Sequence, residues 1–370
     1  MEFTVSKTEL VKELGLSQGV VEKKTTIPVL SNVLIEAREG EIVLTTTDLE
    51  LGVRCGCPAT VKKPGSSTLP SRKLLDYVRL LPDADLSVKI GETHAASIIC
   101  GRSRTRMAGM SRENFPELPK MPAVLAQIPA ALLTNLITRT VFAISSEGSR
   151  YTLNGALLLL KPDSITMVST DGHRLAFVEA VHTFEGITGQ LRALVPKKAM
   201  IEIQRLATEG GGSLAVGLAN DENHLFFQFG KRLLITRKLT GQFPDYERVL
   251  PRDNDQVVSV NRTEMEAAIM RVSQFADERS HAIRMILSPG ELKLAASGSD
   301  AGEAEETILI EGSTTELQIG FNSLYMLDFL RAISTEAIQF DLKDEQSAGQ
   351  IRPAGETDYQ YRYVIMPMRI

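Results

Sequence analysis

One stretch of helical sequence occurs three times in this chain, at residues 70–79, 196–205 and 322–331. In each copy two apolar residues directly precede an acidic residue. An arginine follows the acidic residue by three positions, a spacing at which the two charges can form a weak ion pair on a helix. The acids are Asp76, Glu202 and Asp328, the arginines are Arg79, Arg205 and Arg331, and both series recur every 126 residues. The apolar positions share one face of an amphipathic helix. A constant interval of this length predicts three copies of one structural unit.

A second helix precedes each copy and repeats with it. It begins near residues 6, 129 and 261, each time after a short apolar strand, and Leu10 and Leu14 belong to its apolar stripe in the first copy. Ser6 and Asn261 each precede a glutamate by three residues, which predicts a capping box at the start of the helix. Both helices in each third of the chain are therefore expected to bury one face.

Short runs rich in β-branched residues, separated by turn dipeptides, follow these helices and predict antiparallel meanders. Each third thus contains strand, helix and strands twice over. We expect an α+β fold of three similar domains, each with two helices packed on antiparallel sheets. Linkers that begin with Phe-Pro at residues 115 and 243 place the domains at residues 1–121, 122–250 and 251–370.

The formal net charge of −5 argues at first against a nucleic-acid partner, but the charge is unevenly distributed. Residues 1–121 carry 17 basic and 15 acidic side chains, residues 122–250 carry 13 and 11, and residues 251–370 carry 11 and 20. The excess of acid is confined to the last third. The first two thirds can therefore present a basic surface despite the negative total.

Composition and motifs exclude several classes of protein. The chain is 43% hydrophobic and 24% charged, as soluble globular proteins are. It has no apolar run near the roughly 20 residues that span a bilayer and no signal-peptide pattern, so we expect a cytoplasmic protein. Cys55, Cys57 and Cys100 lack the spacing of a zinc site or a disulfide framework. Motifs of nucleotide-binding loops, zinc proteases and serine hydrolases are absent, so no catalytic residue, metal or cofactor is predicted.

Two features are ambiguous when each is taken by itself. The segment Thr170-Asp-Gly-His-Arg-Leu175 lies between two strands, and its Asp-Gly pair is most simply a hairpin turn with solvated neighbours. The C-terminal Met366-Pro-Met368 contains adaptable apolar side chains that suit a surface for several partners, but it could equally close the edge of a sheet. Neither feature predicts a site without the other.

The triplicated helix carries further basic residues in its first two copies. Arg72 and Arg79 are seven positions apart and share one helical face. Lys198 and Arg205 have the same spacing, whereas the third copy has Leu324 at the first of these positions. A single charged helix is usually a solvated surface. Recurrence in two copies favours contact with phosphates, which position a nucleic acid without reading its sequence.

Four segments spread over the chain match one family of proteins. They are Tyr151-Thr-Leu-Asn-Gly155, Thr170-Asp-Gly-His-Arg-Leu175, Gln242-Phe-Pro-Asp-Tyr246 and Tyr363-Val-Ile-Met-Pro-Met-Arg-Ile370. With them the whole chain resembles the bacterial β sliding clamps, the processivity subunits of DNA polymerase III. The resemblance implies that two chains associate head to tail into a closed ring of six similar domains. Duplex DNA would pass through the ring, touched weakly and without sequence specificity at its phosphates.

The resemblance also implies roles for individual residues. Positions that match DNA-facing residues of the family are Lys24, Arg72, Lys73, Arg79, Arg150, Tyr151, Lys197, Lys198 and Arg205. A pocket for short peptide motifs from the replicative polymerase catalytic subunit, the clamp loader, translesion polymerases and repair proteins is implied at fifteen residues. They are Leu153, Thr170, Gly172, His173, Arg174, Leu175, Pro244, Arg248, Val249, Val364, Met366, Pro367, Met368, Arg369 and Ile370. His173 and the C-terminal tail converge on this pocket.

The subunit interface of the homodimer is implied between a strand of the first domain and a helix end of the third. The residues are Arg104, Thr105 and Met107 on the strand, and Gln274 and Phe275 at the helix end. A protein of this kind is a tether rather than an enzyme, because it raises the effective concentration of a polymerase at its template.

Three residues depart from the family pattern. Thr152 stands where some relatives carry a second aromatic residue, Glu147 where some carry an amide, and Thr105 where some carry an aromatic residue. We expect weaker DNA contact near Tyr151, while the strength of the dimer stays open.

Two other interpretations remain beside the clamp. A small-molecule enzyme on a triplicated α+β scaffold would need a titratable cluster in a cleft, which the sequence does not reveal. The other alternative is a structural oligomer with no role on DNA. A clamp should stay on a closed DNA circle and leave linear DNA, whereas such an oligomer should be lost equally from both.

Overall fold

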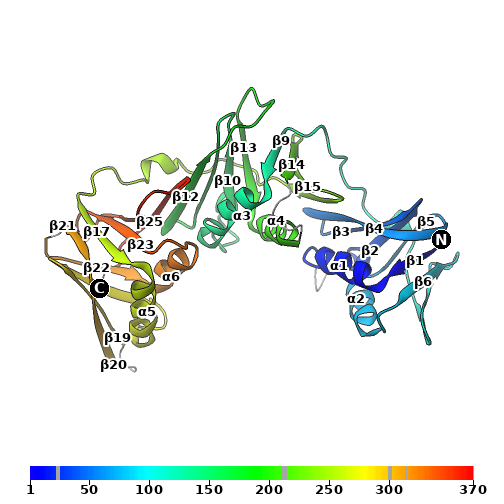
Figure 1. Cartoon of the computed structure of the whole chain (residues 1–370), viewed down its shortest axis with the longest axis horizontal. Coiled ribbons are helices and arrows are strands. Elements are labelled where there is room, and N and C mark those ends of the chain that lie inside the picture. Colours follow the sequence, from blue (N-terminus) through cyan, green and yellow to red (C-terminus); the bar gives the residue numbers. More distant parts are fainter. Residues whose placement is uncertain (22–25, 210–214, 299–301, 314, 370) are drawn as a thin grey trace. The chain divides into compact units, whose positions relative to one another are not determined.

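The computed structural model describes residues 1–21, 26–209, 215–298, 302–313 and 315–369 of the chain. Contacts between residues group the chain into two compact units, whose elements Figure 1 labels. The first unit comprises Met1–Thr134 and Lys198–Lys238, and the second comprises Asn135–Lys197 and Leu239–Ile370. Within the described ranges, no helix has the length and apolar content that a membrane span requires.

The first unit is built on one antiparallel sheet of twelve strands. Its strands are β1 (Glu2–Ser6), β2 (Asn32–Arg38), β3 (Glu41–Thr47), β4 (Leu51–Lys63), β5 (Gly65–Pro70), β6 (Asp85–Ile90), β7 (Ala96–Cys100), β8 (Ser103–Met107), β9 (Ala126–Pro129), β14 (Ala215–Asn220), β15 (His224–Phe229) and β16 (Arg232–Arg237). Hydrogen-bonded neighbours follow the order β8-β7-β6-β1-β4-β16-β15-β14-β9, and β3, β2 and β5 extend from β4. The helices α1 (Lys7–Ser17) and α2 (Ser71–Leu80) lie side by side against this sheet (Figure 1). Two short 3₁₀ helices are η1 (Pro28–Ser31) and η2 (Arg112–Asn114).

The second unit has two antiparallel sheets. The nine-stranded sheet has the order β13-β10-β11-β12-β25-β24-β23-β17-β21, and the four-stranded sheet has the order β20-β19-β18-β22. The strands are β10 (Gly155–Leu160), β11 (Ser164–Thr170), β12 (Arg174–Val181), β13 (Leu191–Pro196), β17 (Gln256–Asn261), β18 (Ala282–Ser288), β19 (Glu291–Gly298), β20 (Gly302–Leu309), β21 (Glu311–Ser313), β22 (Leu317–Asn322), β23 (Ala337–Leu342), β24 (Gly349–Pro353) and β25 (Tyr359–Ile365). The helices α5 (Arg262–Val272) and α6 (Ser323–Arg331) pack against each other (Figure 1). Its 3₁₀ helices are η3 (Val141–Ala143), η4 (Tyr151–Leu153), η5 (Tyr246–Arg248) and η6 (Ser273–Phe275).

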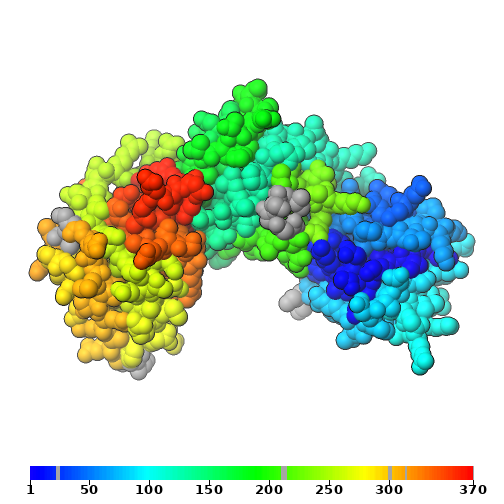
Figure 2. Space-filling model, in the orientation of Figure 1, coloured from blue at the N-terminus to red at the C-terminus, as the bar shows by residue number. Residues whose placement is uncertain are grey.

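The strands of the central third of the sequence are divided between these sheets. In the first unit β16 pairs with β4, and in the second unit β12 pairs with β25. In Figure 2 the C-terminal strand, coloured red, lies against the green central segment that it pairs with. Continuous pairing between thirds explains why contacts group the chain into two units rather than three. The three-domain boundaries at residues 121 and 250 stay a prediction.

The helices of the repeat form where the sequence predicts them. α1, α3 (Ala130–Thr138) and α5 are the helices that open each third, and α2, α4 (Lys197–Glu209) and α6 are the triplicated ones. Each helix directly follows a strand, and every described pair of strands in these sheets is antiparallel. The expected α+β fold, with two helices and antiparallel strands in each third, is confirmed.

The apolar pair of the triplicated helix is buried in two of its three copies, α2 and α6. In α4, Met200 is buried but Ile201 is 48% exposed. The buried stripe of α4 continues from Met200 to Ile203 and Leu206 instead, at the spacing of one helical face. The expectation that the second apolar residue belongs to the core in every copy is therefore wrong for Ile201.

One of the two expected helix caps forms. Asn261 Oδ1 accepts hydrogen bonds from the amides of Thr263 and Glu264, at 3.0 and 3.1 Å. Such a bond satisfies amides that have no partner inside the helix. At α1 the Ser6 side chain makes no capping hydrogen bond, so the predicted capping box there is wrong.

Candidate functional site

The turn between β11 and β12 is held rigid by its own side chains. Thr170 Oγ1 donates to the carbonyl of Arg174 at 2.6 Å and accepts from the amide of Gly172 at 3.0 Å. Asp171 Oδ1 accepts from the amides of His173 and Arg174, at 3.0 and 3.1 Å. Gly172 has a φ of +92°, a conformation that favours glycine. The turn therefore leaves His173 exposed and turns Arg174 inward.

The guanidinium of Arg174 is buried and has a partner at each nitrogen. Nε donates to Asp171 Oδ2 at 3.0 Å, Nη1 to Asp328 Oδ2 at 2.7 Å, and Nη2 to the carbonyl of Phe142 at 2.7 Å. Burial by itself lowers the pKa of Arg174, but the Tyr363 hydroxyl and the carboxylates of Asp328 and Asp171 outweigh burial and raise it. Arg174 is therefore a permanent, immobilised cation that bridges the turn to α6.

The C-terminal tail lies beside the turn. β25 pairs with β12 along its length. Beyond β25, the amide of Met366 donates to the carbonyl of His173 at 2.9 Å, which fixes the tail beside the turn. Two residues later, the amide of Met368 donates to the carbonyl of Gly320 at 2.8 Å and extends the edge of β22. The tail thus contacts the turn and also closes a sheet edge.

One cavity of about 160 Å³ lies between the turn, the tail and the linker after residue 243. It is lined by Leu153, Thr170, Gly172, His173, Arg174, Leu175, Pro244, Tyr246, Val249, Val364 and Met366. Its deepest apolar walls, Leu175 and Val364, are almost completely buried. A dry apolar cavity of roughly 150 Å³ accommodates benzene. This cavity therefore has room for a single aromatic or aliphatic side chain.

Ten of the fifteen residues assigned to the peptide pocket line this cavity. Arg248 does not: it is exposed, pairs with Asp245 at 2.8 Å and lines a separate hollow. Pro367, Met368 and Arg369 line another hollow, because the bond from Met368 to β22 carries the tail away from the turn. Ile370 lies outside the described residues. This cavity therefore includes ten of the fifteen assigned residues, and the role of the other five stays a prediction.

Two side chains of this site were not assigned to it from the sequence. Tyr246 lines the cavity and stacks on Phe177 with ring centroids 5.9 Å apart. Its place in the Gln242-Phe-Pro-Asp-Tyr246 segment was the available signal. Asp328 binds the guanidinium of Arg174. No signal in the sequence assigned Asp328 to this site, because the repeat pattern predicted that it pairs with Arg331.

The acid–arginine pairs of the triplicated helix form as predicted in one copy only. In α4 the two side chains lie 3.6 Å apart. In α6, Asp328 pairs with Arg174 instead, and Arg331 pairs with Glu266 at 3.4 Å. In α2 neither residue has an ion pair within the described part of the chain. The prediction that the acid and the arginine pair in every copy is therefore wrong for α2 and α6. In α6 both residues have partners on other elements, and in α2 both side chains are exposed.

Five of the nine residues assigned to DNA lie exposed on helices of the first unit. They are Arg72, Lys73 and Arg79 on α2, and Lys198 and Arg205 on α4. Among the described contacts, none involves the charged groups of Lys73 and Arg79. Lys24 lies outside the described residues.

The C-terminal turn of α1 gathers cations from both of these helices. Arg205 Nη2 donates to the carbonyl of Gly15 at 2.5 Å, and Arg72 Nη2 donates to the carbonyl of Val21 at 3.3 Å. Lys198 Nζ pairs with the carboxylate of Asp48 and lies 3.4 Å from the carbonyl of Val20, which follows α1. The C-terminus of a helix carries partial negative charge, which favours cations there. A basic patch contributed by α2 and α4 is therefore built around the end of α1.

The other three DNA-assigned residues belong to the second unit. Tyr151 is 72% exposed, and Lys197 is half-buried at the start of α4. Arg150 Nη1 donates to the carbonyl of Asp171 at 3.0 Å, and its Nε lies 3.1 Å from a carboxylate oxygen of Glu147. Arg150 therefore supports the turn of the cavity, and its charge is partly neutralised by Glu147.

The residues assigned to the subunit interface lie at sheet edges. β8 pairs only with β7 within the described sheets; on it Arg104 is exposed, Thr105 is half-buried and Met107 is buried in the core. Gln274 and Phe275 form part of η6, which packs on β19 and on the edge strand β20. Phe275 is 36% exposed. Of the five residues, Met107 is packed in the core, and Gln274 Nε2 donates to the carbonyl of Met270 at 3.3 Å.

The three cysteines are buried and free of disulfides. Burial, with the carboxylates of Glu13 and Glu9, raises the pKa of the Cys57 thiol to about 12. In the ranges that the structure describes, His, Cys, Asp and Glu side chains do not gather in threes as a metal site would need.

Known proteins match this chain along its whole length. Models of the DNA polymerase III beta subunit match residues 1–119 (N-terminal domain), 127–245 (central domain) and 247–369 (C-terminal domain). The beta sliding clamp of Pseudomonas putida is 36% identical over 376 aligned residues, which cover all of both chains.

Solved structures agree with this. The crystal structure of the DNA polymerase III subunit beta from Pseudomonas aeruginosa, 36% identical, superposes with a TM-score of 0.93 over the whole of both chains. The sliding clamp of Bartonella birtlesii, solved with bound griselimycin, is 34% identical with a TM-score of 0.95, again over the whole of both chains. Full-length identity above 30% together with three domain models leaves one assignment: the chain belongs to the DNA polymerase III beta subunit family, the family of the beta sliding clamps.

Proposed function

We propose that this chain is the subunit of a ring that encircles duplex DNA and tethers DNA polymerase and other DNA-processing proteins to it. The observation that carries the proposal is the small apolar cavity at the Thr170–Arg174 turn, in a chain that belongs to a clamp family. A tether needs no reacting groups. It acts by raising the local concentration of its partner, so the protein is not an enzyme and uses no cofactor.

The cavity takes the anchor side chain of a short peptide motif. Arg174 is buried and held by three partners within the chain, so we assign recognition to the apolar walls formed by Leu175 and Val364. One buried aromatic or aliphatic anchor in a fixed pocket is the usual source of affinity in such complexes. The peptides come from the replicative polymerase catalytic subunit, the clamp loader, translesion polymerases and repair proteins, which take turns at one pocket.

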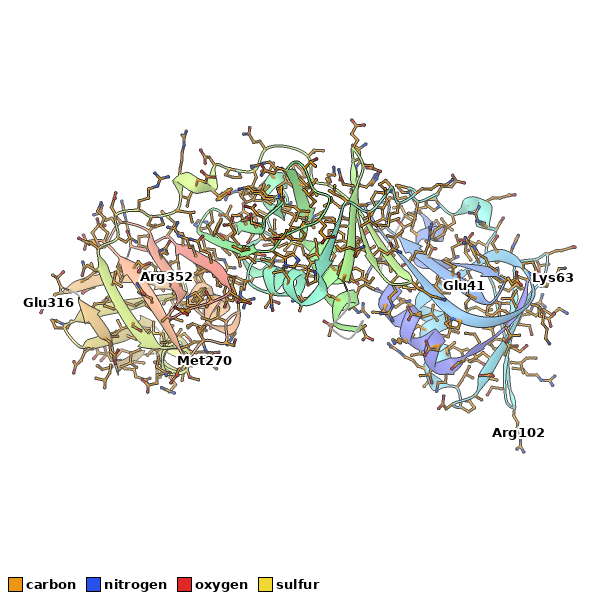
Figure 3. All side chains as sticks on the ribbon, turned by 45° about the horizontal axis from the view of Figure 1, so that its top comes forward. Glu41, Lys63, Arg102, Met270, Glu316 and Arg352 are labelled. Carbon is orange, nitrogen blue, oxygen red and sulfur yellow. The ribbon has the colours of Figure 1, made fainter. Side chains whose placement is uncertain are left out.

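The ring is a head-to-tail homodimer joined at two free sheet edges. β8 presents exposed Arg104 and Arg106, and the edge strand β20 presents exposed Glu303 and Glu305. Figure 3 shows Arg102 at the tip of the hairpin that ends in β8. It also labels Met270, on the helix α5 that packs against β20. Unpaired edges template pairing with another chain. Opposite charges on the two edges favour pairing between different edges, which yields a ring of two chains.

DNA passes through the ring beside the exposed cations of α2 and α4. Lys73 and Arg79 have no partner within the described residues. Arg72 and Arg205 contact carbonyls at or just after the end of α1, and Lys198 and Arg205 also pair with Asp48 and Glu202. Phosphate contacts of this kind are weak, exchange with salt and carry no sequence information, so they allow sliding. Three domains at residues 1–121, 122–250 and 251–370, close to the matched family ranges, would make six domains in the ring. A clamp of this kind acts in the cytoplasm.

The topological model is tested by loading the protein onto nicked circular DNA and then cutting half of the sample to linear form. We expect retention on the circle and loss from the linear DNA, because a ring slides off a free end. Equal loss from both forms would sink the model and favour a structural oligomer. Buried paired carboxylates in the pocket of a crystal structure would instead revive the alternative of a small-molecule enzyme.

A further inference from the structure

The turn between β3 and β4 reproduces the turn of the cavity. Thr47 Oγ1 donates to the carbonyl of Leu51 at 2.9 Å and accepts from the amide of Leu49 at 3.0 Å. Asp48 Oδ1 accepts from the amides of Glu50 and Leu51, at 3.0 and 2.7 Å. Leu49 has a φ of +79°, close to the +92° of the glycine in the other turn. The two turns have the same bonds at the same positions, 123 residues apart.

The surroundings of the two turns also correspond. The amide of Arg237, just after β16 pairs with β4, donates to the carbonyl of Glu50 at 2.8 Å. In the cavity, the amide of Met366 makes the same bond to His173 at 2.9 Å. A linker that starts with Phe-Pro follows each of the two repeats. The first unit therefore contains a structural counterpart of the peptide pocket.

The counterpart differs at the wall. Pairing with β16 places Gly52 opposite Ile235, where the cavity has Leu175 opposite Val364. Leu118 takes the linker position of the pocket's tyrosine, three residues after its Phe-Pro phenylalanine. A Cβ on Gly52 would lie 2.9 Å from Leu118 Cδ1 and 3.2 Å from Cδ2, closer than ordinary contact. The side chain of Leu118 thus occupies the space that a wall residue at position 52 would need.

Leu118 is held in this place by an apolar cluster. It is half-buried and packs on the cluster of Ala219, Phe226 and Ile235, together with Met121. Pairing with Ile235 makes this cluster the counterpart of the wall that Val364 forms in the pocket. Leu118 therefore fills space beside Gly52 that a wall side chain takes in the pocket, and it does so from the linker position that Tyr246 holds there.

The two positions that hydrogen-bond beside the turn carry opposite charges in the counterpart. The carboxylate of Glu50 and the guanidinium of Arg237 lie 3.6 Å apart. Both side chains are more than half exposed, so the pair contributes little stability. The same two positions at the open cavity are His173 and Met366, which form no ion pair.

We propose that the junction at Thr47–Gly52 is a closed copy of the peptide pocket, with the Leu118 side chain as its built-in occupant. Removing that side chain opens a second site on the protomer, which takes a single aromatic or aliphatic side chain. Closure by Leu118 leaves each protomer with one docking site, although the turn chemistry for two is present. The inference rests on the proposed role of the pocket only for the class of occupant.

The first experiment uses crystals of the full chain soaked in 5-bromoindole, with the bromine located by anomalous scattering. Wild-type protein should show a peak in the Leu175 cavity and none at Gly52. Leu118→Ala should add a second peak above Gly52. Met121→Ala, which trims a neighbouring apolar side chain on the same cluster, should not add one.

The outcomes separate the two proposals. No second peak in Leu118→Ala, or a peak above Gly52 in wild-type protein, overturns the inference. Loss of the expected peak in the Leu175 cavity with a clear peak above Gly52 in Leu118→Ala counts against the pocket of the proposed function and leaves the inference standing.

A second experiment transfers the glycine and the leucine of the closed junction into the open pocket. It tests whether this pair closes a pocket without creating a cavity by truncation. Leu175→Gly combined with Tyr246→Leu transfers the closing pair to the open pocket, and we expect the bromoindole peak there to disappear. Leu175→Gly alone removes an apolar wall of the pocket, so its peak should weaken, whereas in the double variant the new leucine should occupy the cavity and no peak should remain. A peak that survives in the double variant shows that the glycine–leucine pair is not what closes the junction.

Discussion

Asp328 of α6 accepts a 2.7 Å hydrogen bond from Nη1 of Arg174, which joins the third copy of the triplicated helix to the turn of the pocket. The same guanidinium lies over the ring of Tyr325, also on α6, with its Cζ 4.1 Å from the ring centroid. Removing one partner of a buried ion pair is costly, because the other charge is left desolvated. A scaffold residue of the repeat therefore supports the wall of the pocket.

Asp328→Asn should weaken both the fold of the second unit and the pocket. Asp328 is 37% exposed, so we expect a loss of about 1 kcal/mol rather than the larger cost of a fully buried pair. That corresponds to a fall of roughly 2–4 °C in apparent Tm and a peptide affinity about fivefold weaker. Calorimetry and fluorescence anisotropy with a labelled polymerase-tail peptide measure the two. Asp76→Asn, the same change in α2, should alter neither; equal effects from both variants would show that Asp328 has no special role.

Deletion of Met366–Ile370 should abolish peptide binding and leave the dimer intact. The deletion removes Met366 from the cavity wall together with its bond to His173, while β25 remains paired with β12. The readouts are peptide anisotropy and sedimentation. A milder variant, Met366→Ala, keeps the main-chain bond and should weaken binding about tenfold through lost apolar contact. Unchanged peptide affinity in the deletion would contradict the assignment of the pocket.

Arg79→Ala should reduce the number of salt-sensitive DNA contacts. The side chain is exposed and has no partner among the described residues, so it is available to a phosphate. The slope of log K against log salt should become shallower by about one for each lost contact. Arg331→Ala is the matched control, because Arg331 holds the same helical position but lies 3.4 Å from Glu266 in the acidic third. An unchanged slope in Arg79→Ala would remove this residue of α2 from the DNA surface.

Arg104→Glu should weaken the dimer. It places an acid on the free edge of β8, which we pair with the acidic edge of β20, so like charges would face each other. We expect the dimer dissociation constant to rise about tenfold or more at low salt and less at high salt. Analytical ultracentrifugation measures it. Lys62→Glu, an equal charge reversal on the exposed end of β4, serves as control, and a dimer unaffected by Arg104→Glu would place the interface elsewhere.

Glu202→Gln should raise stability at neutral pH. Burial raises the pKa of Glu202, and the nearby Arg205 and Lys198 only partly oppose this. A carboxyl whose pKa is raised on folding binds its proton more tightly when folded, so stability falls as the pH rises through that pKa. The apparent Tm of the variant should exceed that of the wild type at about pH 7 and converge with it near about pH 4. In the control Glu209→Gln, at the exposed end of α4, we expect the apparent Tm to differ little from that of the wild type at either pH. A lower Tm for Glu202→Gln at neutral pH would mean that the pairing of Glu202 with Arg205 outweighs the cost of burying its charge.

Local patterns in the sequence were sufficient for the helices and for the turn beside the pocket. The 126-residue repeat predicted α2, α4 and α6, because apolar spacing along a helix depends only on residues within two turns. The Thr170-Asp-Gly turn is likewise local, since its hydrogen bonds join residues at most four positions apart. The resemblance to a family then brought the C-terminal tail to this turn.

Tertiary packing decided the features that no local pattern contains. Asp328 and Arg331 have the spacing of a helical pair, yet each takes a partner from another element that the fold brings nearer. Gly52 and Leu118 are far apart in the sequence and nothing near either residue predicts that they meet. Their contact depends on how the linker crosses β4, which only the packed chain determines. By itself the sequence indicated the turn at Thr170–Arg174. The tertiary structure decided that Thr47–Leu51 forms the same turn and that Leu118 lies against Gly52, because both depend on contacts between distant segments.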